Sequence, residues 1–321
     1  MKIWCNGDFG EEGMRRLAEG VAGHTLLLAT QKERSVLIPG QPDPALSGAD
    51  VAFGQPDADD CMRSPTLRWI EVSSAGYTRY DTPAFREALR GRGAAFTNAS
   101  QVYADACAEH ALAMILAMGR QLLPSYGTQL KDHGWPQAER RAASRLVTGS
   151  TVVMLGFGAI GRRLAELLAP FRVRVYALRR QIRSEPGVHV VPEEDLTKVL
   201  AEADHVVNLL PENDETRNYV NARRISCFRP GARFYNIGRG ATVDQRALVE
   251  GLRSGRVGSA YLDVTSPEPL PEGDPLWTAP NCFITPHTAG GRDGEGVELV
   301  RHFLGNLAAL EKGLPMTDRV L

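Results

Sequence analysis

The chain has 321 residues, 43% of them hydrophobic and 23% charged, a composition typical of a globular protein of about two domains and too apolar for a disordered chain. Its 37 Lys and Arg residues balance 38 Asp and Glu residues to a net charge of −1, so no global charge favours nucleic acid or an anionic membrane. Without a long apolar run, a signal-peptide core or closely spaced cysteines, we expect a cytoplasmic protein with no membrane span, disulfide scaffold or metal site.

Short apolar runs alternate with turn-rich or helical segments over the first 96 residues, which is typical of a parallel sheet. An Ala- and Met-rich stretch from Gln101 to Leu123 predicts a long, mostly buried helix. The polar, weakly periodic residues 124–149 predict a connection with some helix. Strands of the first region are expected near Met1–Trp4, Thr25–Leu28, Asp50–Phe53 and Leu67–Val72.

The alternation resumes after Ser150 and predicts a doubly wound sheet of six or seven strands. The last helix is expected over residues 294–312, where apolar residues recur at helical spacing. Helices between the strands are expected at Arg162–Leu168, Glu193–Ala201 and Gln245–Ser254. The strands are expected at Thr151–Leu155, Val173–Leu178, Val188–Val191, His205–Leu210, Arg233–Ile237, Val257–Leu262 and Cys282–Thr285.

A glycine-rich turn after the first of these strands matches the pattern G-x-G-x-x-G. It follows an apolar strand and opens an amphipathic helix, the arrangement that brings backbone N–H groups to a pyrophosphate at a helix N-terminus. The sequence therefore predicts a dinucleotide site formed by Gly156, Gly158, Ala159, Ile160 and Gly161.

The next strand ends without the acid that usually binds the ribose 2′-hydroxyl of NAD. Arg179 and Arg180 stand there instead, with Arg183 shortly after, and no acid occurs before Glu185. Guanidinium groups pair well with a 2′-phosphate, so the sequence favours NADP over NAD, although NAD stays possible and the arginines have an alternative interpretation as solvated surface residues.

Four polar residues directly follow or lie close to the ends of later strands: Arg239, Asp263, Glu268 and His287. Ligands of open α/β sheets bind at the carboxyl ends of the strands, so we expect these side chains to converge. Reducing a 2-keto acid requires a cation for the carboxylate, a proton donor for the alkoxide and a carboxylate that keeps the donor protonated. Arginine, histidine and glutamate match these requirements.

These stretches resemble the D-isomer-specific 2-hydroxyacid dehydrogenases over nearly the whole chain. The resemblance implies that Arg239 binds the substrate carboxylate and polarises the keto group, and that His287 is the general acid and base, paired with Glu268. Asp263 would lie near the nicotinamide. Cofactor contacts are implied for Leu210, Pro211, Ile237, Gly238, Arg239, Asp263, His287 and Gly290. The matching stretches are Gly156–Gly161, Asn236–Gly240, Leu262–Val264 with Glu268–Leu270, and Thr285–His287.

The resemblance also implies an α/β fold of two doubly wound parallel-sheet domains. A Rossmann dinucleotide-binding domain, 98–290, would be inserted into a flavodoxin-like substrate domain made of 1–97 and 291–321. Backbone amides of Ala75 and Gly76 would bind the substrate carboxylate, and the protein would be a homodimer. Three positions depart from the family pattern: Thr78, Asn208 and Thr265.

We expect an NADPH-preferring reductase that converts a small 2-keto acid, of glyoxylate or hydroxypyruvate type, to the D-2-hydroxy acid. The alternatives are the same fold acting on another substrate such as phosphite, or a non-catalytic NAD(P)-sensing protein. The Glu268 and His287 pair argues against a formate dehydrogenase, which transfers no proton. His110 and His302 fall within expected helices, and we interpret them as structural.

Overall fold

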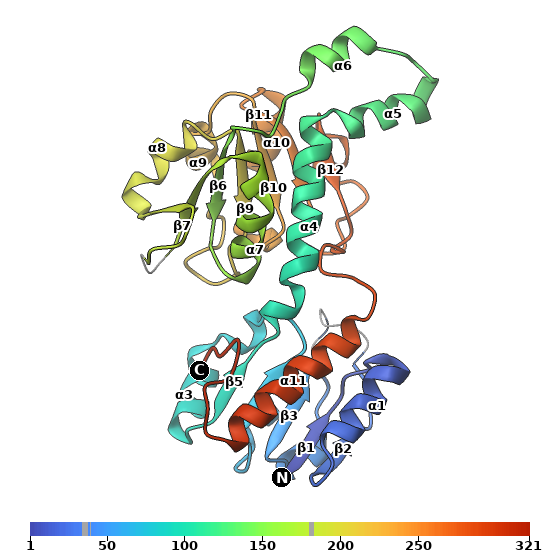
Figure 1. The fold of residues 1–321 in the computed structure, drawn as a ribbon, viewed down its shortest axis with the longest axis vertical. Helices are drawn as coiled ribbons and strands as arrows, with labels where there is room; N and C mark the ends of the chain where they lie inside the picture. The colour runs from blue at the N-terminus through green and yellow to red at the C-terminus, as the bar shows by residue number, and fades with distance from the viewer. Residues whose placement is uncertain (34–37, 39, 180–182) are drawn as a thin grey trace. The chain divides into compact units, whose positions relative to one another are not determined.

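The computed structural model describes residues 1–33, 38, 40–179 and 183–321. It divides into two compact units, Met1–Tyr103 with Gly291–Leu321, and Ala104–Gly290 (Figure 1). The larger unit is thus an insertion in the chain of the smaller one. Arg180, one of the predicted cofactor residues, lies outside the described residues.

The smaller unit contains a five-stranded parallel sheet in the order β2-β1-β3-β4-β5. This is the flavodoxin-like order, in which the connections run to both sides of the first strand. Its strands are β1 Lys2–Cys5, β2 Thr25–Leu28, β3 Val51–Gly54, β4 Trp69–Val72 and β5 Ala95–Thr97, and its helices are α1 Gly10–Gly20, α2 Ala58–Arg63, α3 Pro83–Gly91 and α11 Glu295–Glu311.

The larger unit contains a seven-stranded parallel sheet in the order β12-β11-β10-β9-β6-β7-β8. The order reverses between β6 and β9, the switch point at which Rossmann folds bind a dinucleotide. The predicted class of two doubly wound parallel sheets is therefore confirmed. The strands are β6 Thr151–Leu155, β7 Arg174–Leu178, β8 Val188–Val191, β9 His205–Asn208, β10 Ala232–Asn236, β11 Val257–Leu262 and β12 Cys282–Ile284.

Helix α4, Ser100–Gly119, begins in the smaller unit and continues into the larger one. The helices that follow are α5 Leu122–Asp132, α6 Gln137–Ala143, α7 Ala159–Leu168, α8 Leu196–Leu200, α9 Ala222–Ser226 and α10 Gln245–Arg253. Short 3₁₀ helices are η1 Pro44–Gly48, η2 Thr78–Tyr80, η3 Ala169–Phe171, η4 Glu193–Asp195, η5 Gly240–Thr242 and η6 Pro275–Thr278.

The long helix predicted over 101–123 is wrong at its C-terminal end. Gln121 adopts the left-handed conformation, with φ of 60°, and this breaks the predicted helix into α4 and α5. The sequence analysis also missed β5, because a strand of three residues is too short for any alternation to show. It missed the five-residue helix α9 for the same reason.

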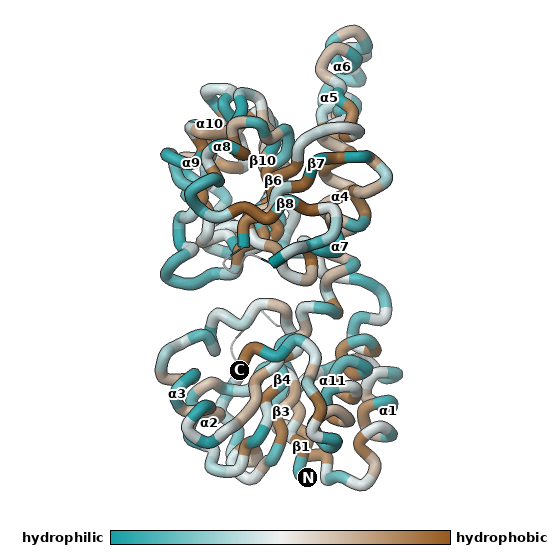
Figure 2. Tube along the Cα trace, turned by 60° about the vertical axis from the view of Figure 1, so that its left-hand side comes forward, coloured by the Kyte–Doolittle hydropathy of each residue, from teal (hydrophilic) through white to brown (hydrophobic). Residues whose placement is uncertain are grey.

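Hydrophobic residues concentrate along the central strands, while many outer helices and loops are hydrophilic (Figure 2). In the smaller unit, α11 packs on the sheet through Phe303, whose ring stacks on Phe53 at 4.2 Å and on Trp69 at 5.0 Å between centroids. Phe303 and both partners are fully buried. Burial of these three rings holds the C-terminal helix against strands from the start of the chain.

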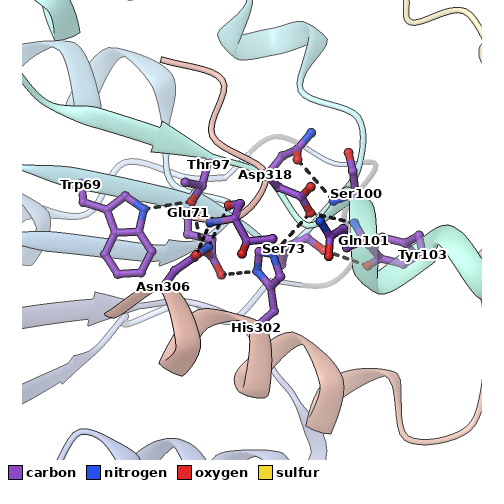
Figure 3. Close-up of polar contacts among 12 residues, drawn as sticks. Trp69, Glu71, Ser73, Thr97, Ser100, Gln101, Tyr103, His302, Asn306 and Asp318 are labelled. Carbon is purple, nitrogen blue, oxygen red and sulfur yellow. Dashed lines mark hydrogen bonds and ion pairs between the residues drawn. The ribbon is translucent and has the colours of Figure 1, made fainter. Parts of the chain in front are cut away.

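A buried polar network joins β4, β5, α11 and the C-terminal segment of the smaller unit (Figure 3). The Glu71 carboxylate, 1% exposed, accepts hydrogen bonds from Thr97 Oγ1 at 2.9 Å, Asn306 Nδ2 at 2.6 Å and His302 Nδ1 at 3.0 Å. The other imidazole nitrogen of His302 lies 3.3 Å from Asp318 Oδ2. The imidazole therefore bridges two carboxylates from distant parts of the chain.

In the part of the chain that the structure describes, no helix combines the length and the apolar character that crossing a bilayer requires. Among the same residues, no cluster of three or more His, Cys, Asp or Glu side chains is arranged to hold a metal ion.

Candidate active site

The glycine fingerprint lies at the switch point of the larger sheet. Gly156 follows β6 with φ of +92°, and a Cβ atom on it would lie 3.1 Å from the carbonyl carbon of Leu209, which follows β9. Gly158 is the N-cap residue of α7 and provides no side chain to cap its first turn. A Cβ atom on Gly158 would meet nothing within 4 Å. The turn is therefore closely packed behind and open in front, as an approaching pyrophosphate requires.

The backbone after β9 and β10 forms the neighbouring part of this edge. Leu210 is almost buried, and a Cβ atom on Gly238 would lie 2.8 Å from its carbonyl oxygen, so only glycine allows the two segments to approach this closely. Asn208, which departs from the family pattern, is fully buried and donates from Nδ2 to Asn236 Oδ1 at 2.9 Å. Nδ2 also donates to Thr242 Oγ1 at 2.7 Å. Asn208 thus holds β9 to the turn that carries Arg239.

Arg179 stands immediately after β7, next to the residue whose carbonyl accepts the Gly156 N–H at 3.2 Å. Its Nη1 donates to Glu185 Oε1 at 2.5 Å, and the two side chains are only 22% and 18% exposed. Glu185, seven positions beyond Leu178, therefore supplies the acid that is absent from the strand end itself. Its carboxylate pairs with the Arg179 guanidinium, which the sequence analysis assigned to a 2′-phosphate.

The side chains of His287 and Glu268 form a hydrogen-bonded pair. His287 Nδ1 lies 2.8 Å from Glu268 Oε2, and the second oxygen of Glu268 accepts the Thr265 N–H at 3.0 Å. Burial alone would raise the pKa of Glu268, but His287, the Thr265 N–H and Arg239 hold the pKa below its ordinary value. The carboxylate therefore fixes Nδ1 and leaves Nε2 as the imidazole nitrogen available to a substrate.

Arg239 follows β10 and is partly buried beside this pair. Burial lowers the pKa of its guanidinium, an effect opposed by the negative charges of Glu268 and Glu212. The Arg239 carbonyl accepts hydrogen bonds from Thr242 Oγ1 at 2.6 Å and Asn236 Nδ2 at 3.2 Å, which fix the backbone from which the side chain extends. The structure thus brings a cation, an imidazole and a carboxylate together at one edge of the sheet.

The turn that carries His287 is held by Asp263. His287 has a left-handed backbone, with φ of 54°, which is unfavourable for a residue with a Cβ atom. The Asp263 carbonyl accepts the His287 N–H at 2.9 Å, and its carboxylate accepts the N–H groups of Thr288 at 2.9 Å and Ala289 at 3.0 Å. Three successive backbone donors on one buried residue stabilise this conformation.

The predicted substrate loop lies in the smaller unit. The Ala75 carbonyl accepts Asn98 Nδ2 at 2.8 Å, and the Gly76 carbonyl accepts Ser74 Oγ at 2.6 Å. Among the described residues, neither the Ala75 N–H nor the Gly76 N–H has a backbone or side-chain acceptor. Two adjacent amides with held carbonyls can bind a carboxylate.

Sequence reasoning missed three features of this site: the pairing of Glu185, the role of Asn208 and the use of Asp263 as a backbone clamp. Each depends on a contact between segments that only the fold brings together. The one available signal was that Asp263 directly follows a strand, which also fits a contact to the cofactor.

Comparison with known proteins identifies the family. Residues 112–289 match the family model described as the NAD-binding domain of D-isomer specific 2-hydroxyacid dehydrogenases. The chain is 30% identical over 273 residues to a glyoxylate reductase of Aeropyrum pernix, covering 80% of this chain and 77% of that protein. It is also 30% identical over 251 residues to D-3-phosphoglycerate dehydrogenase of Mycobacterium tuberculosis, covering 76% of this chain but only 46% of that longer protein.

Two solved structures share the whole fold. A D-isomer specific 2-hydroxyacid dehydrogenase of Xanthobacter autotrophicus Py2, in complex with NADPH and MES, has a TM-score of 0.83 at 26% identity over 100% of this chain and 98% of that one. An NADPH-dependent glyoxylate/hydroxypyruvate reductase of Sinorhizobium meliloti, in complex with NADP and sulfate, has a TM-score of 0.81 at 25% identity over 99% and 98%.

Proposed function

The chain belongs to the D-isomer specific 2-hydroxyacid dehydrogenase family, and from this premise we propose that it reduces a small 2-oxo acid, of glyoxylate or hydroxypyruvate type, to the D-2-hydroxy acid with NADPH. The observation that carries the proposal is the His287–Glu268 pair at 2.8 Å, beside Arg239 and on the sheet that bears the glycine fingerprint. A protein that only senses a dinucleotide has no need of this acid–base pair.

The larger unit, corresponding to the predicted domain 98–290, would bind the cofactor, and the smaller unit would bind the substrate carboxylate through the amides of Ala75 and Gly76. The close-packed Gly156 and Gly238 and the open front of Gly158 fit a dinucleotide. Further contacts to it are proposed for Ala159, Ile160, Gly161, Leu210, Pro211, Ile237, Asp263, His287 and Gly290.

The bound nicotinamide would supply the hydride for the keto carbon. Arg239 would bind the substrate carboxylate and polarise the keto oxygen. His287 would give its Nε2 proton to that oxygen as the alkoxide forms, and Glu268 would stabilise the imidazolium before the transfer. In the oxidation direction the same nitrogen would remove the hydroxyl proton.

A panel of 2-oxo acids assayed with NADPH and NADH tests the proposal. We expect oxidation of NADPH with glyoxylate or hydroxypyruvate, and a D-configured product wherever a stereocentre forms. Reduction of NADP by phosphite, with no turnover of any 2-oxo acid, would instead assign the fold to that substrate. Cofactor binding without turnover of any acid would identify a sensing protein.

The preference for NADPH depends on whether the Arg179 guanidinium pairs with Glu185 or with the 2′-phosphate of the cofactor. Related structures bind NADPH or NADP, and the Arg179 guanidinium follows β7 where the ribose is expected. Glu185, which pairs with it, would both repel a 2′-phosphate and compete for the guanidinium. We therefore expect NADPH to be preferred and NADH to be accepted.

Replacing Glu185 by glutamine is expected to raise the ratio of kcat/KM for NADPH to that for NADH about tenfold, because the carboxylate no longer opposes the phosphate. Initial rates with each cofactor at a fixed 2-oxo acid concentration measure this ratio. Asp195→Asn, which removes the carboxylate of the exposed Lys198 ion pair, is the control and should leave the ratio unchanged. An unchanged ratio in E185Q would show that Arg179 does not bind the phosphate.

We also propose that the protein is a homodimer through the segment 119–147. Figure 1 shows α5 and α6 extending away from the rest of the larger unit, and neither helix has a buried residue. Large apolar side chains lie exposed along this segment: Leu122 at 57%, Tyr126 at 57%, Leu130 at 66%, Trp135 at 90% and Leu146 at 67%. A second copy of the chain would bury them.

A further inference from the structure

A chain of four side chains runs through the larger unit from α4 to the turn that carries His287. His110 Nε2, on α4, forms a short hydrogen bond with the Tyr261 hydroxyl on β11. The Tyr261 hydroxyl lies 2.5 Å from Thr285 Oγ1, and Thr285 Oγ1 donates to Asp263 Oδ1 at 2.6 Å. Asp263 is the residue that clamps the backbone of residues 287–289.

The number of protons sets the direction of every hydrogen bond in this chain. Thr285 has one hydroxyl proton and gives it to Asp263, so its oxygen must accept from Tyr261. Tyr261 has then used its own proton, so it must accept from His110, and His110 must carry a proton on Nε2. All three donors therefore point toward the Asp263 carboxylate, and each bond polarises the next one.

Both carboxylate oxygens of Asp263 accept hydrogen bonds in these contacts. Its carboxylate, in a residue only 3% exposed, accepts one hydroxyl and two backbone N–H groups. Rotating this carboxylate would release the Thr288 and Ala289 amides that support the left-handed His287. Thr285 Oγ1 donates to this carboxylate, and the Tyr261 hydroxyl, which also lies close to Asp263, limits the orientations that Thr285 can adopt.

We propose that His110 and Tyr261 are positioning residues for His287, acting through Thr285 and Asp263. This inference rests on the proposed role of His287 as the proton donor. It assigns a function to a histidine that sequence reasoning interpreted as structural. We call this chain of hydrogen bonds from His110 to Asp263 the relay. It requires a hydrogen-bond donor at the position of His110 Nε2, because only a donor there keeps the Tyr261 proton directed at Thr285.

A second His–Tyr pair, within the sheet of the same unit, provides a comparison. His205 Nδ1 and the Tyr235 hydroxyl lie 2.9 Å apart on β9 and β10, and both residues are buried. Burial lowers the pKa of His205 to about 4, so it is neutral at physiological pH. No further side-chain contact of this pair leads toward Asp263 within the described residues. Removing the Tyr235 hydroxyl therefore shows the effect of breaking a buried His–Tyr hydrogen bond that is not connected to Asp263.

The relay predicts distinct effects for three variants. Tyr261→Phe and His110→Phe, which remove the donors, should each lower kcat about tenfold while the KM for NADPH stays within about twofold. His110→Gln keeps an N–H near the position of Nε2 and should retain at least half of the wild-type kcat. Tyr235→Phe, the control, should retain full kcat even if it lowers the unfolding midpoint.

Amide hydrogen exchange gives a readout that needs no substrate. The Thr288 and Ala289 amides should exchange about tenfold faster in Y261F and H110F than in the wild type, but not in H110Q or Y235F. Unchanged exchange at these two amides, or a wild-type kcat in Y261F, would overturn the relay. If the wild type reduces no 2-oxo acid, the proposed function fails, and the exchange rates still decide whether the relay holds the turn.

Discussion

Replacing His287 by asparagine is expected to lower kcat for reduction of the 2-oxo acid by about a thousandfold, while the Kd for NADPH changes by less than about threefold. Transfer of a proton by a positioned side chain contributes about 10²- to 10⁴-fold to a rate, and no other imidazole of the larger unit adjoins both Glu268 and Arg239 among the described residues. Stopped-flow turnover and fluorescence titration with NADPH measure the two quantities.

Asparagine is the appropriate replacement because of the backbone at this position. His287 has φ of 54°, a conformation that asparagine tolerates better than alanine. Alanine would add backbone strain to the loss of the imidazole, so a low rate in H287A would have two causes. A wild-type kcat in H287N would exclude His287 as the proton donor.

Glu268→Gln is the companion variant, because it retains an oxygen to accept the Nδ1 hydrogen bond but loses the negative charge. We expect kcat to fall about tenfold, because the proton donor His287 loses the negative charge that supports its protonated form. A wild-type kcat in E268Q would show that the charge of Glu268 contributes nothing to the proton transfer.

The order of the elements was predictable because each signal is local. Val152–Leu155 is an unbroken apolar run, the glycines follow at once, and the helix face after them repeats at helical spacing. The positions of Arg239, Glu268 and His287 followed from a rule of topology, that parallel strands end at one edge. Neither inference requires knowledge of which loops contact each other.

The rest depended on side-chain contacts that only the folded backbone defines. Glu185 lies beside Arg179, which precedes it by six residues, and no spacing in the sequence indicates this pairing. Asp263 was predicted as a site residue from its place after a strand, but the donors to its carboxylate, Thr285 and two backbone amides, were not predicted. The composition of a strand end predicts that a polar residue is present there, but not which donors it meets.

The buried network around His302 leads to the second large effect, on stability. Burial would lower the pKa of His302, but its contacts with Asp318 and Glu71 prevail and raise the pKa to about 9. The imidazole is therefore charged at neutral pH, between a carboxylate on β4 and one in the C-terminal segment (Figure 3). Asp318 also accepts the Gln101 N–H of α4 at 2.7 Å, so the same ion pair anchors the start of that helix.

The sign of the pH dependence follows from the raised pKa. The unfolded chain loses the His302 proton near the ordinary pKa of 6.5, whereas the folded chain keeps it to about 9. The stabilisation is complete below pH 6.5, decreases by about 1.4 kcal/mol per pH unit above it, and is lost as the pH rises through 9. A pKa raised from 6.5 to about 9 corresponds to about 3 kcal/mol in total.

Substitution of His302 by glutamine, which keeps a donor for Glu71 but cannot be charged, isolates this contribution. We expect the difference in unfolding free energy between wild type and H302Q to shrink by about 3 kcal/mol between pH 6 and pH 10. Fluorescence during denaturant unfolding reports on the smaller unit, because its Trp4 and Trp69 are 1% and 0% exposed, whereas Trp135 and Trp277 of the larger unit are 90% and 51% exposed.

His24→Gln provides the control, because His24 also contacts a carboxylate, but one whose side chain is 46% exposed. Its difference from wild type should stay within about 1 kcal/mol over the same pH range, since solvent screens the pair. A difference for H302Q that does not change between pH 6 and pH 10 would mean that His302 is neutral in the folded protein. Glu71 and Asp318 would then be held by their neutral donors, Thr97, Asn306 and the Gln101 N–H. The C-terminal segment would stay bound to the rest of the smaller unit at alkaline pH.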